Sequence, residues 1–255
     1  YPMRHWMRGF ELGLDKRMTG IFVGSTIHKE QLRQAGFESP IHVVSLPIHK
    51  ELTEAKIKGM VPERKSCNVI YSSRLDKEKN PFFMLSVAEQ FLQELPAAEW
   101  HVTTSGKEFK SMMPGVLDAM NELAARQPRF KLLNNLTKEE YYMELASARI
   151  QFNCALQDYV SWTVLEATTF GCDLVYPNFR SFPEFIPPDR LYTPFNVNSA
   201  VIRLREVMTK TNPEYNITYL SDLGRQMEGY IVANGLDHEI NIWHESEYCK
   251  RLLNK

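Results

Sequence analysis

The chain has 255 residues, 44% of them hydrophobic, which is enough for one large or two small domains with a packed core. Its 30 basic and 31 acidic side chains leave a net charge of −1, so no strongly basic face indicates a nucleic-acid partner, although a nucleic-acid acceptor stays possible in principle. No stretch approaches the ~20 apolar residues that cross a bilayer. The N-terminal residues lack the basic-then-apolar pattern of a signal peptide.

The cysteines are scattered and show no CxxC or HxxxH spacing, so the sequence predicts no metal site. Three of the four lie in or beside apolar segments, where a free thiol behaves as a small hydrophobic side chain. We therefore expect reduced cysteines and a cytoplasmic protein. The sequence does not start with Met, and we expect it to begin inside a longer protein. The cysteines are Cys67, Cys154, Cys172 and Cys249.

Strand-like apolar runs alternate with helix-like stretches, which is typical of a parallel α/β sheet. The first part of the chain predicts a strand at 20–24, a helix at 27–35 that ends at Gly36, and a strand at 41–45. Two strands are too few for a domain. We therefore expect residues 1–50 to be the end of an incomplete N-terminal Rossmann-like domain, completed by a missing segment or by another chain. The polar residues 51–66 are expected to form a linker.

Residues 67–210 predict a second, larger Rossmann-like unit. The expected strands are 68–72, 100–104, 130–133, 150–155 and 173–176. The expected helices are 82–95, 110–126, 137–148, 162–170 and 199–210, with two more at 219–233 and 238–253. Thr137 and Glu140 have the spacing of a capping box, which places a helix start there.

Two basic residues follow the first strand of this unit. In open parallel sheets, ligands bind at the carboxyl ends of the strands, where helix N-termini suit a diphosphate. Arg74 comes directly after the predicted strand, and Lys79 is five residues further on. Both are strong donors, so together they could hold one phosphate group from two sides. The alternative is a solvated, charged loop.

Two carboxylates follow later strands. Asp158 lies in a loop, and Glu166 lies on the next predicted helix between apolar neighbours. Burying a lone carboxylate costs several kcal/mol, so Glu166 either has a partner or faces a ligand. Carboxylates suit vicinal sugar hydroxyls because each oxygen can accept from one hydroxyl. The alternative is a helix residue that faces solvent. A further carboxylate, Glu184, lies in the loop at 178–184. The alternative is that this is an ordinary connecting loop.

Taken together, these stretches resemble glycosyltransferase family 4. Residues Ser73 to Asn80 are similar to the family's Gly-Arg-Leu-x-x-Glu-Lys-Gly loop. Seven residues separate Asp158 from Glu166, as they separate the family's two glutamates, and Glu166-Ala with Gly171 matches the second half of that motif. The segments at 182–186 and 21–45 also resemble the family. So does the helix with Ile242-Trp243, and the resemblance implies that the C-terminal helices in residues 211–255 pack back toward the N-terminal part.

The resemblance implies a GT-B fold in which residues 67–210 bind a nucleotide-diphosphate sugar, with UDP as the expected nucleotide and no metal or other cofactor. Arg74 and Lys79 would neutralise the diphosphate, and Asp158 would lie near the donor sugar. Glu166 would hold the ribose hydroxyls. Backbone amides at the start of the same helix would meet the phosphate, at Ser161, Trp162 and Thr163.

The sequence departs from the family in four places. Asp158 replaces a glutamate, Tyr-Val-Ser at 159–161 replaces Gly-Phe-Gly, Asn80 replaces a glycine, and the strand before Arg74 ends in Ser72-Ser73 rather than Gly. The family's glycine-rich loop and catalytic His or Asp have no counterpart in residues 1–50, so the acceptor stays unknown.

Three functions remain open at this point. The first is a retaining glycosyltransferase. The second is a sugar-nucleotide epimerase, which would isomerise the donor without consuming an acceptor. The third is a non-catalytic nucleotide-sugar-binding subunit that needs a partner domain. An unrelated Rossmann-like protein is the remaining alternative.

Overall fold

The structure is a computed structural model that describes residues 13, 15–18, 20–43, 57, 67–159 and 161–210. The predicted helices at 219–233 and 238–253, and their packing against the N-terminal part, lie outside these residues. So does the expected linker, except Ile57, whose side chain is buried against the larger unit. None of the described helices is long and apolar enough to cross a membrane.

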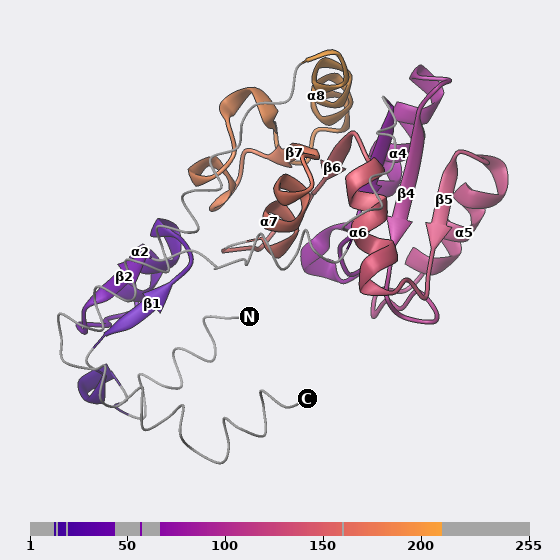
Figure 1. The fold of residues 1–255 in the computed structure, drawn as a ribbon. Coiled ribbons are helices and arrows are strands. Elements are labelled where there is room, and N and C mark those ends of the chain that lie inside the picture. Colours follow the sequence, from indigo (N-terminus) through magenta and orange to yellow (C-terminus); the bar gives the residue numbers. More distant parts are fainter. Residues whose placement is uncertain are drawn as a thin grey trace.

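The larger unit is built on six parallel strands (Figure 1). They are β3 Asn68–Tyr71, β4 Glu99–Thr103, β5 Phe130–Leu133, β6 Ile150–Phe152, β7 Asp173–Pro177 and β8 Leu191–Tyr192. Their spatial order is β5-β4-β3-β6-β7-β8, so the chain reverses its winding direction between β3 and β6. In doubly wound sheets this switch point opens a crevice at the carboxyl ends of the two strands. The expected Rossmann-like sheet is confirmed; only the two-residue β8 was not predicted.

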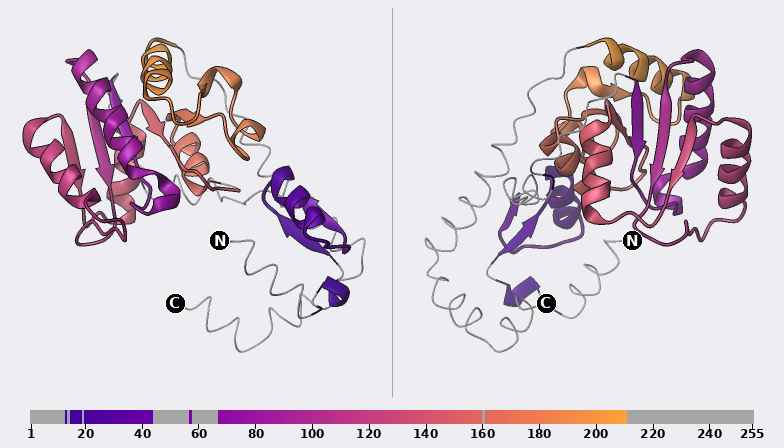
Figure 2. Two further views of the ribbon diagram at one scale, coloured as in Figure 1. Left: turned by 180° about the vertical axis from the view of Figure 1, so that it is seen from behind. Right: turned by 45° about the vertical axis from the view of Figure 1, so that its right-hand side comes forward.

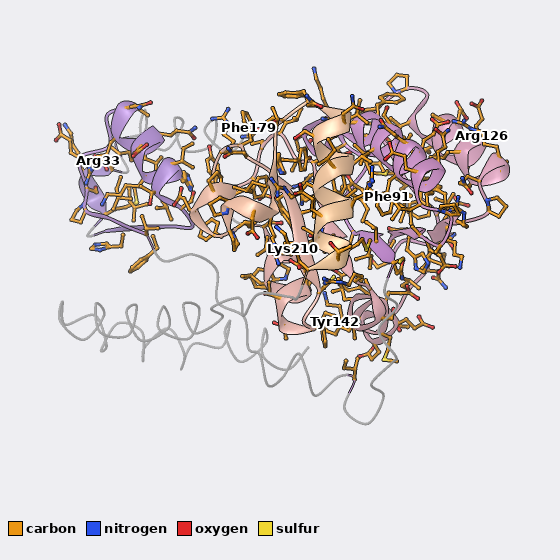
Figure 3. All side chains as sticks on the ribbon, turned by 90° about the horizontal axis from the view of Figure 1, so that it is seen from above. Arg33, Phe91, Arg126, Tyr142, Phe179 and Lys210 are labelled. Atoms are coloured by element: carbon orange, nitrogen blue, oxygen red, sulfur yellow. The ribbon has the colours of Figure 1, made fainter. Side chains whose placement is uncertain are left out.

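Helices cover both faces of this sheet. They are α4 Pro81–Glu94, α5 Val116–Arg126, α6 Lys138–Ser147, α7 Trp162–Thr169 and α8 Val197–Thr209. Val69 and Tyr71 of β3 pack with α4, α5 and α8, whereas Ile70 packs with α6 and α7. Successive side chains of a strand point to opposite faces, so a strand buried on both faces is apolar throughout. Figure 3 shows Phe91 of α4 and Tyr142 of α6 on the two opposite layers.

The ends of several elements follow from local chemistry. The capping box is confirmed, because Thr137 Oγ1 accepts from the Glu140 amide and the Glu140 carboxylate accepts from the Thr137 amide. The helix expected from residue 110 begins only at Val116, since Gly115 has a φ of 76° that is incompatible with a helix. The strand expected to reach residue 155 ends at Phe152, where the Asn153 side chain accepts from the Ala155 amide and turns the chain.

A smaller unit precedes the large sheet (Figure 2). The parallel strands β1 Ile21–Val23 and β2 Ile41–Val43 flank the helix α2 Thr26–Gln34, as the sequence predicted. Five buried side chains form its own small core: Ile21, Val23, Leu32, Phe37 and Ile41.

Candidate functional site

The loops after β3 and β6 and the start of α7 meet at the switch point. One cavity of about 390 Å³ lies here, and a wider one of about 940 Å³ lies beside it. Arg74 lines both cavities. The smaller cavity is lined by Ser72, Ser73, Arg74, Thr103, Thr104, Ser105, Leu136, Thr137, Lys138, Tyr141, Trp162, Thr163 and Glu166. The wider one includes Lys79 and Asp158. The structure thus gathers the residues that the sequence singled out, although they come from distant segments.

Lys79 and Asp158 form an ion pair across the switch point, with 3.0 Å between Nζ and Oδ2. Lys79 belongs to the short 3-10 helix η2 Lys77–Lys79, and Asp158 follows β6. Both side chains are largely buried. Burial raises the pKa of the Asp158 carboxyl above its usual value, although the Lys79 ammonium opposes this shift. The pair therefore joins the two strands that border the crevice.

Arg74 is the most exposed of the predicted site residues; its side chain is 71% exposed. Its guanidinium contacts Asp76 at 2.8 Å and Glu78 at 2.7 Å within its own loop. The sequence predicts that Arg74 and Lys79 bind one phosphate group. In the structure, Arg74 pairs with two carboxylates of the protein and Lys79 with one.

Glu166 is almost fully buried, with 3% of its surface exposed. Its carboxylate accepts from Lys138 Nζ at 2.5 Å, from Tyr141 OH at 2.9 Å and from Tyr142 OH at 3.4 Å. The alternative of a solvent-facing glutamate is therefore wrong, and the carboxylate is paired within the wall of the smaller cavity.

These three partners on α6 were not predicted from the sequence. Lys138, Tyr141 and Tyr142 are spaced three and four residues apart, which places them on one helix face. That spacing, together with a buried glutamate in need of a donor, was the available signal. Burial opposes the charge on Lys138, but the hydrogen bond and charge of Glu166 prevail and raise the pKa of the ammonium.

A chain of hydroxyl groups lies beneath the start of α7. Ser161 Oγ and Thr163 Oγ1 are 2.7 Å apart, and Thr163 Oγ1 is 3.2 Å from Tyr176 OH. Tyr176 OH in turn donates to Gln151 Oε1, whose amide nitrogen donates to the Phe152 carbonyl.

The direction of this chain follows from its inner end. Because Gln151 Oε1 can only accept, Tyr176 donates to it and must accept from Thr163, which then accepts from Ser161. Both hydroxyl protons point into the protein. The two hydroxyls thus offer no proton to an anion at this helix start, which leaves the backbone amides of its first turn as donors there. That Ser161, Trp162 and Thr163 meet a phosphate stays a prediction. The Trp162 side chain is 47% exposed and lines the smaller cavity.

Glu184 contacts the smaller unit. Its carboxylate oxygens accept from the backbone amides of Thr26 at 2.8 Å and Ile27 at 3.1 Å, at the start of α2. Beside it, Tyr159 stacks on His28 with ring centroids 4.0 Å apart and donates to Gln31 at 2.6 Å. The first turn of α2 has no acidic residue of its own. Glu184, in the short 3-10 helix η3 Phe182–Glu184, supplies that negative charge, so this segment is more than an ordinary connecting loop.

We expect Glu184→Ala to loosen the start of α2 by about 0.5–2 kcal/mol, the usual cost of losing an N-cap. Hydrogen exchange at the Thr26 and Ile27 amides measures this directly. Glu184→Gln retains one acceptor oxygen and should give an intermediate rate, whereas the His28 amide, which Ser25 caps, should change little. Equal exchange in all variants would show that Glu184 does not cap α2.

No family model and no curated protein matches this chain. Solved structures do, among them Staphylococcus aureus TarM crystallised with UDP, at 12% identity and a TM-score of 0.62 over 86% of this chain and 41% of that one. The pneumococcal O-GlcNAc transferase GtfA, in complex with UDP and GlcNAc, matches at 12% identity and a TM-score of 0.57 over 90% of this chain and 46% of its own. The GtfA/B complex matches at 15% identity and a TM-score of 0.60 over 85% and 44%.

These structures are GT-B glycosyltransferases. This chain has part of the GT-B fold. The fold expected from the sequence resemblance is thereby confirmed, although this chain spans less than half the length of each of the three proteins. At such low identity the likeness establishes the fold alone.

Proposed function

We propose that the chain is the donor-binding part of a retaining glycosyltransferase. It would move a sugar from a nucleotide-diphosphate sugar, with UDP as the expected nucleotide, to an acceptor not yet identified. The observation that carries this proposal is Glu166. Its buried carboxylate is held in the wall of a cavity at the switch point of a GT-B fold, beside the first turn of α7.

The roles of the cations follow from their exposure. Exposed ion pairs contribute about 0–1 kcal/mol each, so Arg74 can leave Asp76 and Glu78 for a diphosphate at little cost. Lys79 is held more firmly because its pair with Asp158 is largely buried. In this proposal the Arg74 side chain moves to bind the diphosphate, whereas the Lys79 side chain keeps its position and contacts the diphosphate there. The backbone amides at the start of α7 provide the remaining contacts. Positive groups placed where the leaving diphosphate gains charge stabilise the transition state.

Asp158 would lie beside the transferred sugar, because it lines the wider cavity next to Lys79. The cationic side chains and the helix start supply the positive charge, so the proposal needs no metal ion at the diphosphate.

A non-catalytic nucleotide-sugar-binding subunit is the second candidate. It is favoured by the ion pairs, since both cations already hold protein carboxylates. One of the similar structures is itself a complex of two proteins, and a partner chain could supply the acceptor side here.

A thermal-shift panel of UDP-, GDP-, ADP- and TDP-sugars tests the proposal. A ligand at 100 times its Kd stabilises the native state by about 2.7 kcal/mol, which raises the Tm of a chain of this size by roughly 5–10 °C. We expect the largest shift with a UDP-sugar. No shift with any of them would contradict donor binding.

The reaction products then separate the candidates. Release of UDP from the donor supports the enzyme, whereas binding without turnover supports the subunit. An isomerised donor without acceptor consumption would support the epimerase.

A further inference from the structure

The carboxylate of Glu166 is nearly saturated by the protein. An ionised carboxylate offers about four lone-pair positions for hydrogen bonds. Lys138, Tyr141 and Tyr142 fill three of them. Glu166 therefore has room for about one more donor, while a ribose carries two vicinal hydroxyls. The expectation that Glu166 alone holds both hydroxyls does not fit this environment.

Lys138 lies at the same place and has a donor to spare. Its ammonium carries three N–H groups. One is directed to Glu166 and a second to the Tyr142 hydroxyl, which leaves one N–H, and the side chain, 46% exposed, lines the same cavity. The cation also lies 5.0 Å from the ring centre of Tyr141 and 4.7 Å from that of Tyr142, which limits where it can move. A charged donor is thus fixed beside the open acceptor position of Glu166.

A vicinal diol matches this donor and acceptor. One hydroxyl can donate to the free lone pair of Glu166, and the other can accept from Lys138. A 2′-deoxyribose or 3′-deoxyribose lacks one of these two groups. It would leave either the ammonium or the carboxylate without its ligand partner inside the cavity.

We propose that Lys138 is a nucleoside-binding residue that, together with Glu166, recognises the two ribose hydroxyls and so selects ribonucleotide donors over deoxyribonucleotide donors. This inference rests on the proposed function. It assigns a ligand contact to a residue that the sequence resemblance did not mark, and it narrows the donor to the sugars of UDP, GDP or ADP rather than those of deoxythymidine diphosphate.

The test is titration calorimetry of wild type and Lys138→Met with UDP, 2′-deoxyuridine diphosphate and 3′-deoxyuridine diphosphate. Met keeps the apolar stem against the tyrosine rings but cannot donate. A charge-assisted hydrogen bond is worth about tenfold in affinity or more, so we expect Lys138→Met to weaken UDP binding about tenfold. For the deoxynucleotide that lacks the hydroxyl bound by Lys138, the same substitution should change Kd less than about twofold.

Lys131→Met is the matched control. Lys131 also pairs with a carboxylate, that of Glu99 at 2.5 Å, and its side chain is 39% exposed, but it lies on β5 and lines neither cavity. We expect unchanged UDP binding in this variant, and partial recovery in Lys138→Arg, which keeps a charged donor. Melting curves of all variants confirm that they are folded.

The outcomes separate the inference from the function on which it rests. Wild type that binds neither UDP, GDP nor ADP overturns the proposed function, and the role of Lys138 with it. Wild type that binds UDP, together with Lys138→Met that weakens all three uridine ligands equally or none of them, overturns only the role of Lys138.

Discussion

Replacing both Arg74 and Lys79 by alanine is expected to lower donor turnover by about 100- to 10,000-fold. Each residue would give a charge-assisted hydrogen bond to the diphosphate, worth about 1.5–3 kcal/mol, or roughly 10- to 100-fold each. The leaving group gains negative charge as the glycosidic bond breaks, so the loss should appear in kcat as well as in donor affinity. Release of UDP from a UDP-sugar measures it.

Two controls make this result specific. Arg205→Ala with Lys131→Ala removes the same charges from ion pairs outside the two cavities, and donor turnover should persist. Lys79→Ala leaves Asp158 without its partner, so Lys79→Ala with Asp158→Asn shows whether the unpaired carboxylate adds to the loss. Unchanged transfer by the Arg74→Ala, Lys79→Ala variant would refute the assignment of these residues to the diphosphate.

Asp173→Ala is expected to cost about 3–5 kcal/mol of folding free energy, the usual result of leaving buried charges without their partner. Asp173, at the start of β7, is fully buried. Its carboxylate lies 3.2 Å from Arg190, in the short 3-10 helix η4 Pro188–Arg190, and 3.6 Å from Arg149. Arg149 also donates to carbonyls at the end of α8. The group thus ties β7 to η4 and α8, and urea unfolding measures its contribution.

Asp189→Ala is the matched control, because Asp189 also pairs with Arg190. Its side chain is 49% exposed, and its further partner Lys210 is half-exposed. Solvent screens this pair, so the expected cost is below about 1 kcal/mol. Equal costs for the two aspartates would show that burial does not set the strength of this cluster.

Apart from β8 and the short 3-10 helices, the order and type of the elements in the part of the chain that the structure describes could be predicted from the sequence. The strand at 68–71 could be predicted because both faces of the sheet are covered there, so its residues form a short, mostly apolar run. The start of α6 followed from two residues three positions apart, Thr137 and Glu140. These signals are local, and nearby residues are enough to produce them.

The candidate site was predicted in part. Glu166 was expected to need a partner or a ligand, because a buried carboxylate cannot remain alone. Arg74, Lys79, Asp158 and Glu166 all follow predicted strands, which suggested that they lie at the same edge of the sheet. The structure places all four in the walls of two neighbouring cavities. That they bind a donor stays a prediction.

Which charged side chains pair with one another depends on how the elements pack in the folded molecule. Lys79 pairs with Asp158 because β3 and β6 are neighbours in the sheet, and Lys138 reaches Glu166 because α6 packs beside α7. Glu184 caps α2 because the smaller unit lies against that loop. Such contacts join residues far apart along the chain, and their geometry depends on strand order and helix packing. No periodicity or spacing in the sequence encodes these directly, so the partners of each functional side chain became visible only in the folded molecule.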